Sequence, residues 1–513
     1  MFCLPSLLSL HVLSLVSVFP VFTVCPMLMF LVLLPLSRPR IKSMFYHAYN
    51  SYLDNAFPYD ELRPLTCDGQ DTWVNFSLLR VKIGSSSRTQ RVETLYYSHF
   101  MDCFQTSQHC TFETPTGMPY GTVNLLRGVS PTETPVTCTA GVGTFILEFA
   151  TLSRLTGDPT FENVARRALR ALWKTRSDIG LVGNHIDIVS TKWVAQDAGI
   201  GAGVDSYFEY LVKGAVMLQD EELLSMFQAY DRAIQNYTRF DDWYLWVQMH
   251  KGTVSMPIFQ SLEAFWPGLQ SLLGNLDSAV RTFQNYYSVW RQFGGLPEFY
   301  SIPQGYTVDK REGYPLRPEL IESAMYLFRA TGDHTYLQLG VDALESIEKI
   351  AKTPCGYASV KDLRDHQLDN RMESFFLAET IKYLYLLFDP THFLHGGGTE
   401  GDGSWEEGGE AGECVLGAGG FIFNTEAHPL DPAALYCCGR HNQDRQELQD
   451  ILLTLSQPGS QSKPPPEQTE GGSQSESIAL KPGEKKMPPL LSCPVQPFSA
   501  RLSILGQVFT DNT

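Results

Sequence analysis

Hydrophobic positions recur at helical spacing along most of the chain, in a pattern that repeats. Residues 152–158 read Leu-Ser-Arg-Leu-Thr-Gly-Asp and residues 327–333 read Leu-Phe-Arg-Ala-Thr-Gly-Asp. An amphipathic stretch with apolar residues three or four apart follows each copy. Each copy therefore predicts an apolar helix, a turn whose Asp can cap the next helix, and a second, amphipathic helix.

Weaker copies of the unit lie between and after these two. Turns are expected near 219–220 and 274–275, and a helix over 372–388 ends at an Asp-Pro pair. The turns are roughly 55–62 residues apart, the length of one helical hairpin with its loop. Five such units predict an all-α fold closed into an α/α toroid, because an open stack would need polar terminal caps.

The pattern weakens at both ends of this domain, which we place at 43–440. A helix is expected over 43–53, but no amphipathic pair of normal length fits between 68 and 116. Residues 396–412 are rich in Gly, Glu and Asp and predict a flexible loop, whereas the apolar segment 421–429 is assigned to the core. Residues 441–489 predict a disordered tail, and 490–513 a short apolar segment that carries Cys493.

The first 36 residues contain no charged side chain and are dense in Leu, Val, Phe and Met. This pattern is typical of a secretory signal peptide, and an uncleaved signal anchor is the competing interpretation. Either one predicts that the rest of the chain enters the secretory pathway. Sequons at Asn75 and Asn236 fit that compartment.

Charge and cysteine content narrow the class of protein. The 513 residues carry a formal net charge of −17, which argues against a nucleic-acid partner and suits a protein acting on neutral ligands. The eleven cysteines show no zinc-binding spacing. In an oxidising compartment we expect one long-range disulfide among Cys67, Cys355 and Cys414, with the pairing left open.

Acidic residues stand at helix starts or in Gly-rich loops: Asp205, Glu298, Glu319, Glu322 and Glu373, with Arg317 beside one pair. Taken singly, each has an ordinary explanation as a helix cap or a partner of the helix dipole. Their repetition around one end of a toroid instead predicts convergence on a common cavity. Hydrolysis of a glycosidic bond needs two carboxyl groups that flank the scissile bond.

Three segments carry a family resemblance: Leu-Arg-Pro-Glu-Leu-Ile-Glu-Ser at 316–323, the helix at 372–388 and Phe-Asn-Thr-Glu-Ala-His-Pro at 423–429. Together they resemble the class I α-1,2-mannosidases, glycoside hydrolase family 47. Phe-Trp-Pro-Gly at 265–268 and the long tail are similar to the family's ER degradation-enhancing branch. The resemblance covers most of 43–440, apart from the weak stretch, together with the extreme C-terminus.

The resemblance implies an (α/α)7 barrel, a bound Ca²⁺ and inverting removal of α-1,2-linked mannose. Its expected substrates are misfolded glycoproteins with mannose-rich N-glycans, trimmed in the endoplasmic reticulum to promote degradation. Thr425 matches the Thr that binds Ca²⁺ through oxygen, and Glu322, Glu373 and Glu426 would position the ion's waters. Glu319 matches the general base and Asp205 the second carboxylate at the cleavage point. Glu298 matches a further pocket acid, and Arg317 and Phe376 would line the sugar subsite.

Two departures from the family pattern stand out. Ser261 occupies a position where family members often carry His. More seriously, the Phe-Glu-Thr-Asn-Ile-Arg motif, whose Glu is the general acid, is missing. Glu113 lies in a similar Phe-Glu-Thr, but the residues that follow match a later family segment. We therefore expect a toroid that lacks part of its N-terminal hairpins, with uncovered apolar faces and a rate reduced by roughly 10²–10⁴-fold.

Two alternative functions stay open from the sequence. The missing acid favours a lectin-like receptor that binds the same glycans through Ca²⁺ without cutting them. A scaffold role would use the tail, where Cys493 could form a mixed disulfide with an oxidoreductase. An internal disulfide or a free thiol explains Cys493 equally well.

Overall fold

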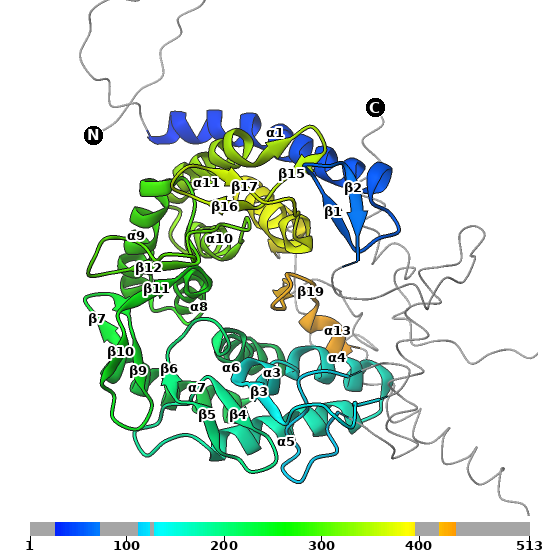
Figure 1. Cartoon of the computed structure of the whole chain (residues 1–513), viewed down its shortest axis with the longest axis vertical. Coiled ribbons are helices and arrows are strands. Elements are labelled where there is room, and N and C mark those ends of the chain that lie inside the picture. The colour runs from blue at the N-terminus through cyan, green and yellow to red at the C-terminus, as the bar shows by residue number, and fades with distance from the viewer. Residues whose placement is uncertain (1–25, 72–110, 124–127, 396–419, 438–513) are drawn as a thin grey trace, which may run out of the picture.

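Helices dominate the computed structural model, which describes residues 26–71, 111–123, 128–395 and 420–437. They are arranged as a ring (Figure 1). Four hairpins pack in sequence order: α4 (Ile146–Thr156) with α5 (Thr160–Lys174), α6 (Asp205–Leu218) with α7 (Glu221–Tyr237), α8 (Trp266–Leu272) with α9 (Leu276–Phe293), and α10 (Glu319–Thr331) with α11 (Thr335–Ser346). A fifth pair joins the two ends of the domain, because α1 (Pro26–Asn55) packs on α12 (Ile381–Phe388).

Shorter helical segments complete the described ring: α3 (Thr139–Gly143), α13 (Pro432–Cys437), the 3-10 turns η2 (Ser261–Phe265) and η5 (Phe393–His395), and the π-helical turns η3 (Ile347–Ala351) and η4 (Phe376–Thr380). Helices α6 and α10 are buried over most of their length, whereas α5 and α7 bury one face. This difference is the one expected between the inner and outer layers of a toroid.

The predicted hairpin turns are confirmed. Helices α4 and α10 end at Gly157 and Gly332, whose φ values of 81° and 68° suit glycine at a helix C-terminus. The Asp after each glycine accepts a hydrogen bond from the backbone N–H two residues later, at 2.9 Å in both turns. These Asp residues therefore precede the helix caps rather than occupying them. Only Asp220, before α7, is itself the cap.

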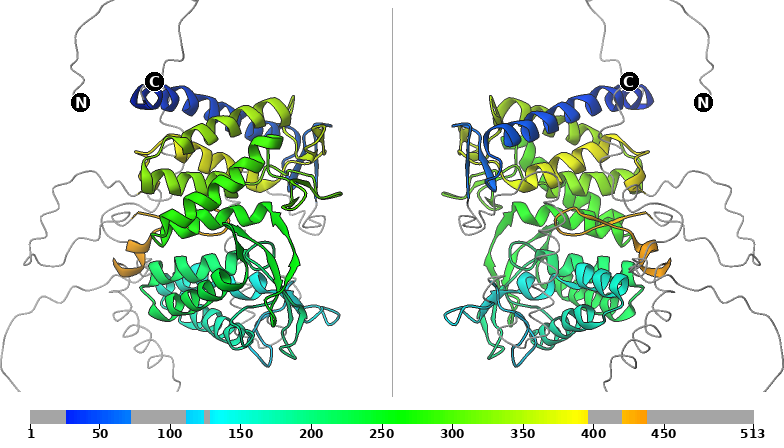
Figure 2. Two further views of the ribbon diagram at one scale, coloured as in Figure 1. Left: turned by 90° about the vertical axis from the view of Figure 1, so that its left-hand side faces the viewer. Right: turned by 90° about the vertical axis from the view of Figure 1, so that its right-hand side faces the viewer.

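Short antiparallel strands gather mainly on one side of the ring (Figure 2). Their groups are β1 (Glu61–Arg63) with β2 (Asp68–Gln70); β3 (Val136–Cys138) with β4 (His185–Asp187) and β5 (Trp193–Ala195); β6 (Asp197–Ala198) with β9 (Trp246–Gln248) and β10 (Val254–Met256); β7 (Arg239–Phe240) with β8 (Trp243–Tyr244); β11 (Ile258–Gln260) with β12 (Phe299–Ser301) and β13 (Tyr306–Thr307); β14 (Lys352–Thr353) with β15 (Gly356–Tyr357); β16 (Val360–Asp362) with β17 (Gln367–Leu368); and β18 (Ile422–Phe423) with β19 (Pro429–Leu430). Most of them connect one helix of the ring to the next.

Two apolar cores lie within the ring. One is built by α4 to α8 and the other by α9 to α12 together with α1. The chain passes between them at η2 and α8, because Ala264 belongs to one core while Phe265 and Trp266 belong to the other. Packing of α8 against α10 joins the two halves on that side of the ring.

The N-terminal helix is longer than the sequence predicted. The expected helix over 43–53 is present, but α1 begins at Pro26, inside the segment assigned to a signal peptide or anchor. Ile41, Met44 and Ala48 are buried against the ring. Within the described ranges, no helix has the length and apolar character needed to cross a membrane. Residues 1–25 lie outside the described part of the chain.

One long-range disulfide is present, as expected. Cys67, in the turn between β1 and β2, bonds to Cys355 between β14 and β15, with the two Cα atoms 5.6 Å apart. The bond fixes the β1–β2 hairpin near the end of α11. Cys414 and Cys493 lie outside the described residues, so the oxidoreductase contact of Cys493 stays a prediction.

Candidate functional site

The predicted acids begin the inner helices. Asp205 is the first residue of α6, and Glu319 is the first residue of α10. Val204 and Pro318, the residues that precede the two helices, make no side-chain cap. Asp205 accepts a hydrogen bond from the Ser206 backbone N–H at 2.9 Å. Both carboxyl groups therefore lie at the same kind of position, where an inner helix meets its connecting strands.

Burial changes the acidity of these groups. It raises the pKa of Asp205 to about 7 and that of Glu319 to about 8, with Arg317 opposing both shifts. Glu322 follows Glu319 by one helical turn, and burial raises its pKa to about 7. At neutral pH this site can therefore hold one carboxyl group protonated and another ionised. A general acid and a general base need that difference.

A buried lysine joins two of the carboxylates. Lys213, only 3% exposed, forms an ion pair with Glu209 on its own helix and lies 3.6 Å from Glu322 on α10. The Tyr383 hydroxyl of α12 donates to Glu322 at 3.3 Å. The sequence analysis did not identify Glu209 and Lys213. The sequence feature that could have identified this ion pair is a Glu and a Lys four residues apart inside an otherwise apolar helix.

Arg317 is held by two contacts. Its guanidinium donates to both carboxylate oxygens of Glu298, at 2.8 and 3.3 Å. The same group lies 5.7 Å from the centre of the Phe375 ring. Glu298 is positioned just before β12, where its backbone N–H donates to the Gly313 carbonyl. The structure thus brings Glu298 and Arg317 together as predicted neighbours of Glu319.

The predicted aromatic, Phe376, lies away from Arg317. Phe376 is fully buried, with its ring 5.1 Å from that of Tyr357, and its side chain belongs to the core. Phe375 is the aromatic beside Arg317. Glu373 forms an ion pair with Arg371 at 3.0 Å, and burial raises its pKa. It precedes the helical segment instead of lying in its first turn.

Two further acids, which no sequence pattern singled out, face this cluster. Glu379, in η4, interacts electrostatically with Glu319, Glu322 and Glu426, and burial raises its pKa to about 10. Within the described part of the chain, its carboxylate has no hydrogen-bond or ion-pair partner. Glu148 on α4 is half-buried, and desolvation raises its pKa as well.

Thr425 lies in the turn between β18 and β19. Its backbone N–H donates to the Tyr210 hydroxyl at 3.3 Å, while the neighbouring Asn424 side chain donates to Glu148 at 2.8 Å. Glu426 is exposed and adjoins the electrostatic cluster of Glu379. Carboxylates outnumber cations around this turn, an arrangement that suits a hard divalent cation with oxygen ligands. Among the described residues, no group of three or more His, Cys, Asp or Glu side chains is arranged to hold a metal by itself.

The two family departures can also be located. Ser261 begins η2 and is buried, and its backbone N–H donates to the Glu298 carbonyl at 3.1 Å. Glu113 is exposed, while its neighbour Phe112 is buried against Phe145. The position of Glu113 gives no support to a role as the missing acid.

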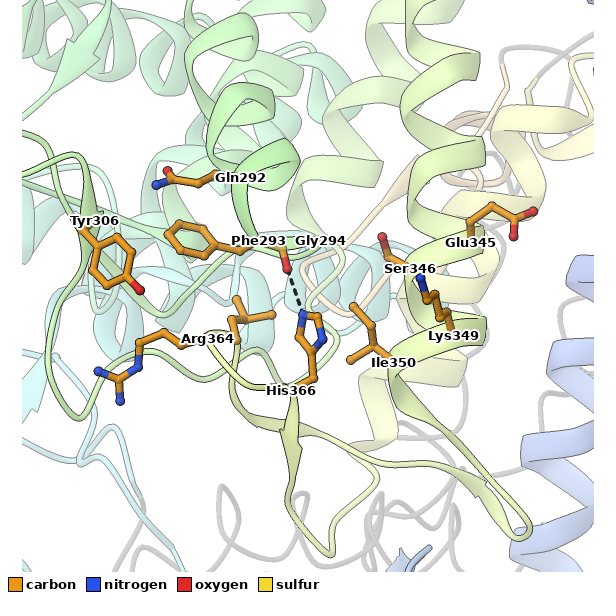
Figure 3. Close-up of a pocket in the computed structure, with 11 residues that line it drawn as sticks. Gln292, Phe293, Gly294, Tyr306, Glu345, Ser346, Lys349, Ile350, Arg364 and His366 are labelled. Atoms are coloured by element: carbon orange, nitrogen blue, oxygen red, sulfur yellow. Dashed lines mark hydrogen bonds between the residues drawn. The ribbon is translucent and has the colours of Figure 1, made fainter.

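A separate cavity of about 730 Å³ lies at the C-terminal end of α9, against α11 and η3 (Figure 3). Its lining includes Phe293, Tyr306, Lys349 and His366. The His366 ring lies 3.4 Å from the Phe293 carbonyl oxygen. None of the predicted site residues lines this cavity, so it is distinct from the carboxylate cluster.

A comparison against protein families identifies the family of this fold. Residues 109–432 match the model of glycosyl hydrolase family 47. The chain therefore belongs to glycosyl hydrolase family 47.

The chain is also similar to individual members of this family. The chain is 59% identical to ER degradation-enhancing alpha-mannosidase-like protein 2 of Homo sapiens, over 93% of this chain and 94% of that protein. It is 41% identical to Alpha-mannosidase I MNS4 of Arabidopsis thaliana, over 69% of this chain and 65% of that protein. The alignment with the human protein is 547 positions long, more than the 513 residues of this chain. It therefore contains positions at which this chain has no residue.

A solved structure supports the fold. The α-1,2-mannosidase from Trichoderma reesei, an (α/α)7 toroid, matches with a TM-score of 0.60 and 21% identity. The match covers 77% of this chain and 99% of that one. The predicted fold class is confirmed.

Proposed function

We propose that this chain removes α-1,2-linked mannose from mannose-rich N-glycans of misfolded glycoproteins in the lumen of the endoplasmic reticulum. The observation that carries the proposal is the pair of half-buried carboxyl groups, Asp205 and Glu319, at the starts of inner helices. Their raised pKa values suit proton transfer near neutral pH. The names of the mannosidase relatives support the substrate class and the compartment.

In this proposal Glu319 acts as the general base. Its ionised form takes a proton from water as the water oxygen forms a bond to the anomeric carbon from the face opposite the leaving group. The bond between the anomeric carbon and the glycosidic oxygen breaks, and that oxygen takes a proton from an acid. Asp205 is a carboxyl group of suitable pKa for that donation. Arg317, fixed by Glu298 and beside Phe375, would bind sugar hydroxyls.

We assign Ca²⁺ as the cofactor, with Thr425 as its protein ligand through hydroxyl and carbonyl oxygen. Glu322, Glu373, Glu379 and Glu426 are candidates to hold the waters around the ion. The Glu379 carboxylate, which has no ion-pair partner among the described residues, and the excess of acids support this assignment. When bound, the ion would supply oxygen-directed binding of sugar hydroxyls.

A non-catalytic receptor for the same glycans is the second candidate. Two observations favour it: the general-acid motif of the family is absent, and the alignment with the human relative is longer than this chain. Loss of an N-terminal hairpin would remove the acid while leaving the described carboxylate cluster. Under this reading the chain would retain glycans without cutting them.

Incubating the purified full chain with a glycoprotein bearing mannose-rich glycans separates the two functions. We expect slow mannose release, roughly 10²–10⁴-fold below that of a relative with the complete motif, because the general acid of that motif is missing and Asp205 would have to donate the proton in its place. Free mannose and the glycan masses report the cleavage, and retention on an immobilised glycan column with and without a chelator reports the binding. Retention with no release above a no-enzyme blank would replace the enzyme proposal with the receptor. Absence of both would contradict both functions.

A further inference from the structure

On the side of the ring away from α8, the segment 420–437 contacts both halves. In Figure 1 it lies between α12 and α4. Helix α13, at its end, packs on α4. On the other side of the ring the halves are joined by continuous chain and by packing of α8 on α10. The carboxylates come from both halves, so their spacing depends on both connections.

Apolar side chains of this segment are divided between the two cores. Phe423 and Ala427 are buried in the core of α9 to α12, and the Phe423 ring lies 5.6 Å from Tyr383 of α12. Ile422 and Leu430 pack on the core of α4 to α8, and Leu435 is buried in it. Because Ile422 pairs with Leu430 and Phe423 with Pro429, one short hairpin reaches both cores.

Hydrogen bonds fix the turn of this hairpin from opposite directions. On one side, the Thr425 backbone N–H donates to the Tyr210 hydroxyl of α6 at 3.3 Å, and the same hydroxyl donates to Glu148 of α4. On the other side, Lys382 Nζ of α12 donates to the Ala427 carbonyl at 2.7 Å. Thr425, the proposed calcium ligand, therefore lies between two anchors that belong to different halves.

The turn also has its own internal restraint. The Asn424 side-chain oxygen accepts from the backbone N–H groups of Glu426 and His428, at 3.0 and 2.7 Å. Ala427 adopts a left-handed conformation with φ 55°, which a residue other than glycine reaches only when its surroundings hold it there. With the turn internally rigid, its placement depends on its contacts with both halves: the bonds to Tyr210 and Lys382 and the bond from Asn424 to Glu148.

We propose that Tyr210 and Lys382 are positioning residues for Thr425. The segment 420–437, called the clasp below, joins the two halves of the ring. The contacts that join the halves therefore also place Thr425 for calcium binding. The calcium part of this inference rests on the cofactor assignment of the proposed function. Neither residue touches substrate in this proposal. Each acts through the backbone of the turn, Tyr210 at Thr425 and Lys382 at Ala427.

Calcium titration of the full chain tests the clasp with Tyr210→Phe and Lys382→Met. Each substitution keeps the apolar body of the side chain and removes one hydrogen-bonding group. We expect each to weaken Ca²⁺ affinity by about tenfold, as loss of an outer-shell contact typically does. The double variant should weaken it by less than the product of the single effects, because either loss alone frees the same turn. Matched controls are Tyr306→Phe and Lys349→Met in the distant cavity of Figure 3, which should bind as the parent does.

Thermal unfolding in the presence of a chelator tests the clasp without the metal. Both clasp variants should unfold about 1–3 °C below the parent, and both cavity variants at the parent temperature. Parent-like calcium affinity in both clasp variants would overturn this inference while leaving the calcium site in place. If the parent itself binds no Ca²⁺, the cofactor assignment fails, and the coupling fails with it. Unchanged unfolding temperatures in chelator would show that the hydrogen bonds do not hold the ring together.

Discussion

Replacing Glu319 by glutamine is expected to reduce mannose release by about 10²–10⁴-fold while glycan retention stays close to that of the parent. Glutamine has nearly the same shape as glutamate but cannot take a proton from the attacking water. The initial rate of free mannose formation is the measurement. Glu345→Gln serves as the matched control, because Glu345 is exposed at the surface in a pair with Arg40. Release by Glu319→Gln within about threefold of the parent would remove Glu319 from the mechanism.

The same substitution has a consequence for stability that does not depend on activity. Folding raises the pKa of Glu319 from its ordinary 4.5 to about 8, so between these values the folded chain binds more protons than the unfolded chain. The free energy of unfolding contributed by this group therefore falls as pH rises from about 4.5 to 8, on the order of a few kcal/mol in all. Glutamine does not titrate, so the variant should lose less stability between pH 5 and pH 8 than the parent. Denaturant titrations at the two pH values measure this difference.

Replacing Lys213 by methionine is expected to lower the free energy of unfolding by about 3–5 kcal/mol. The ammonium group is buried between Glu209 and Glu322, and its loss leaves two carboxylates without their cation in the ring interior. The size of the effect comes from that uncompensated charge, since methionine keeps most of the side-chain packing. Urea or guanidinium titration of the purified variant gives the measurement.

Two further sets of variants test whether unpaired carboxylates cause the loss of stability in Lys213→Met. Lys352→Met removes a partly exposed ion pair with Glu348 and should cost only about 0.2–1 kcal/mol. Adding Glu209→Gln and Glu322→Gln to Lys213→Met should recover part of the stability, because the unpaired charges are then gone. A loss below about 1 kcal/mol for Lys213→Met would show that water already solvates these carboxylates.

Local signals in the sequence predicted the hairpin turns and the first residues of the inner helices. The Gly157 and Gly332 turns are determined by residues close to them in sequence, and so are the helix starts at Asp205 and Glu319. Such features need only glycine conformation, helix periodicity and the spacing of acids. The roles of these residues came from the family resemblance.

The features that the sequence did not reveal depend on contacts between distant segments. The bond from Asn424 to Glu148 joins residues 276 positions apart, so no local pattern indicates it. The helix expected from 372 is shifted instead: Glu373 precedes it, and the π-helical turn η4 follows Phe375. A π-helical turn changes which side chains share a face, and such turns are frequent at functional sites. At this turn Phe375 lies beside Arg317, whereas Phe376 is buried in the core.

The Cys67–Cys355 bond closes a loop of 288 residues that contains most of the ring. A protease that nicks the backbone once anywhere inside this loop would leave one covalent molecule, since the two pieces stay linked through sulfur. The first helix could not diffuse away from α12 after such a cut. A ring cut in this way would keep α1 tethered beside α12 until a reductant separated the pieces.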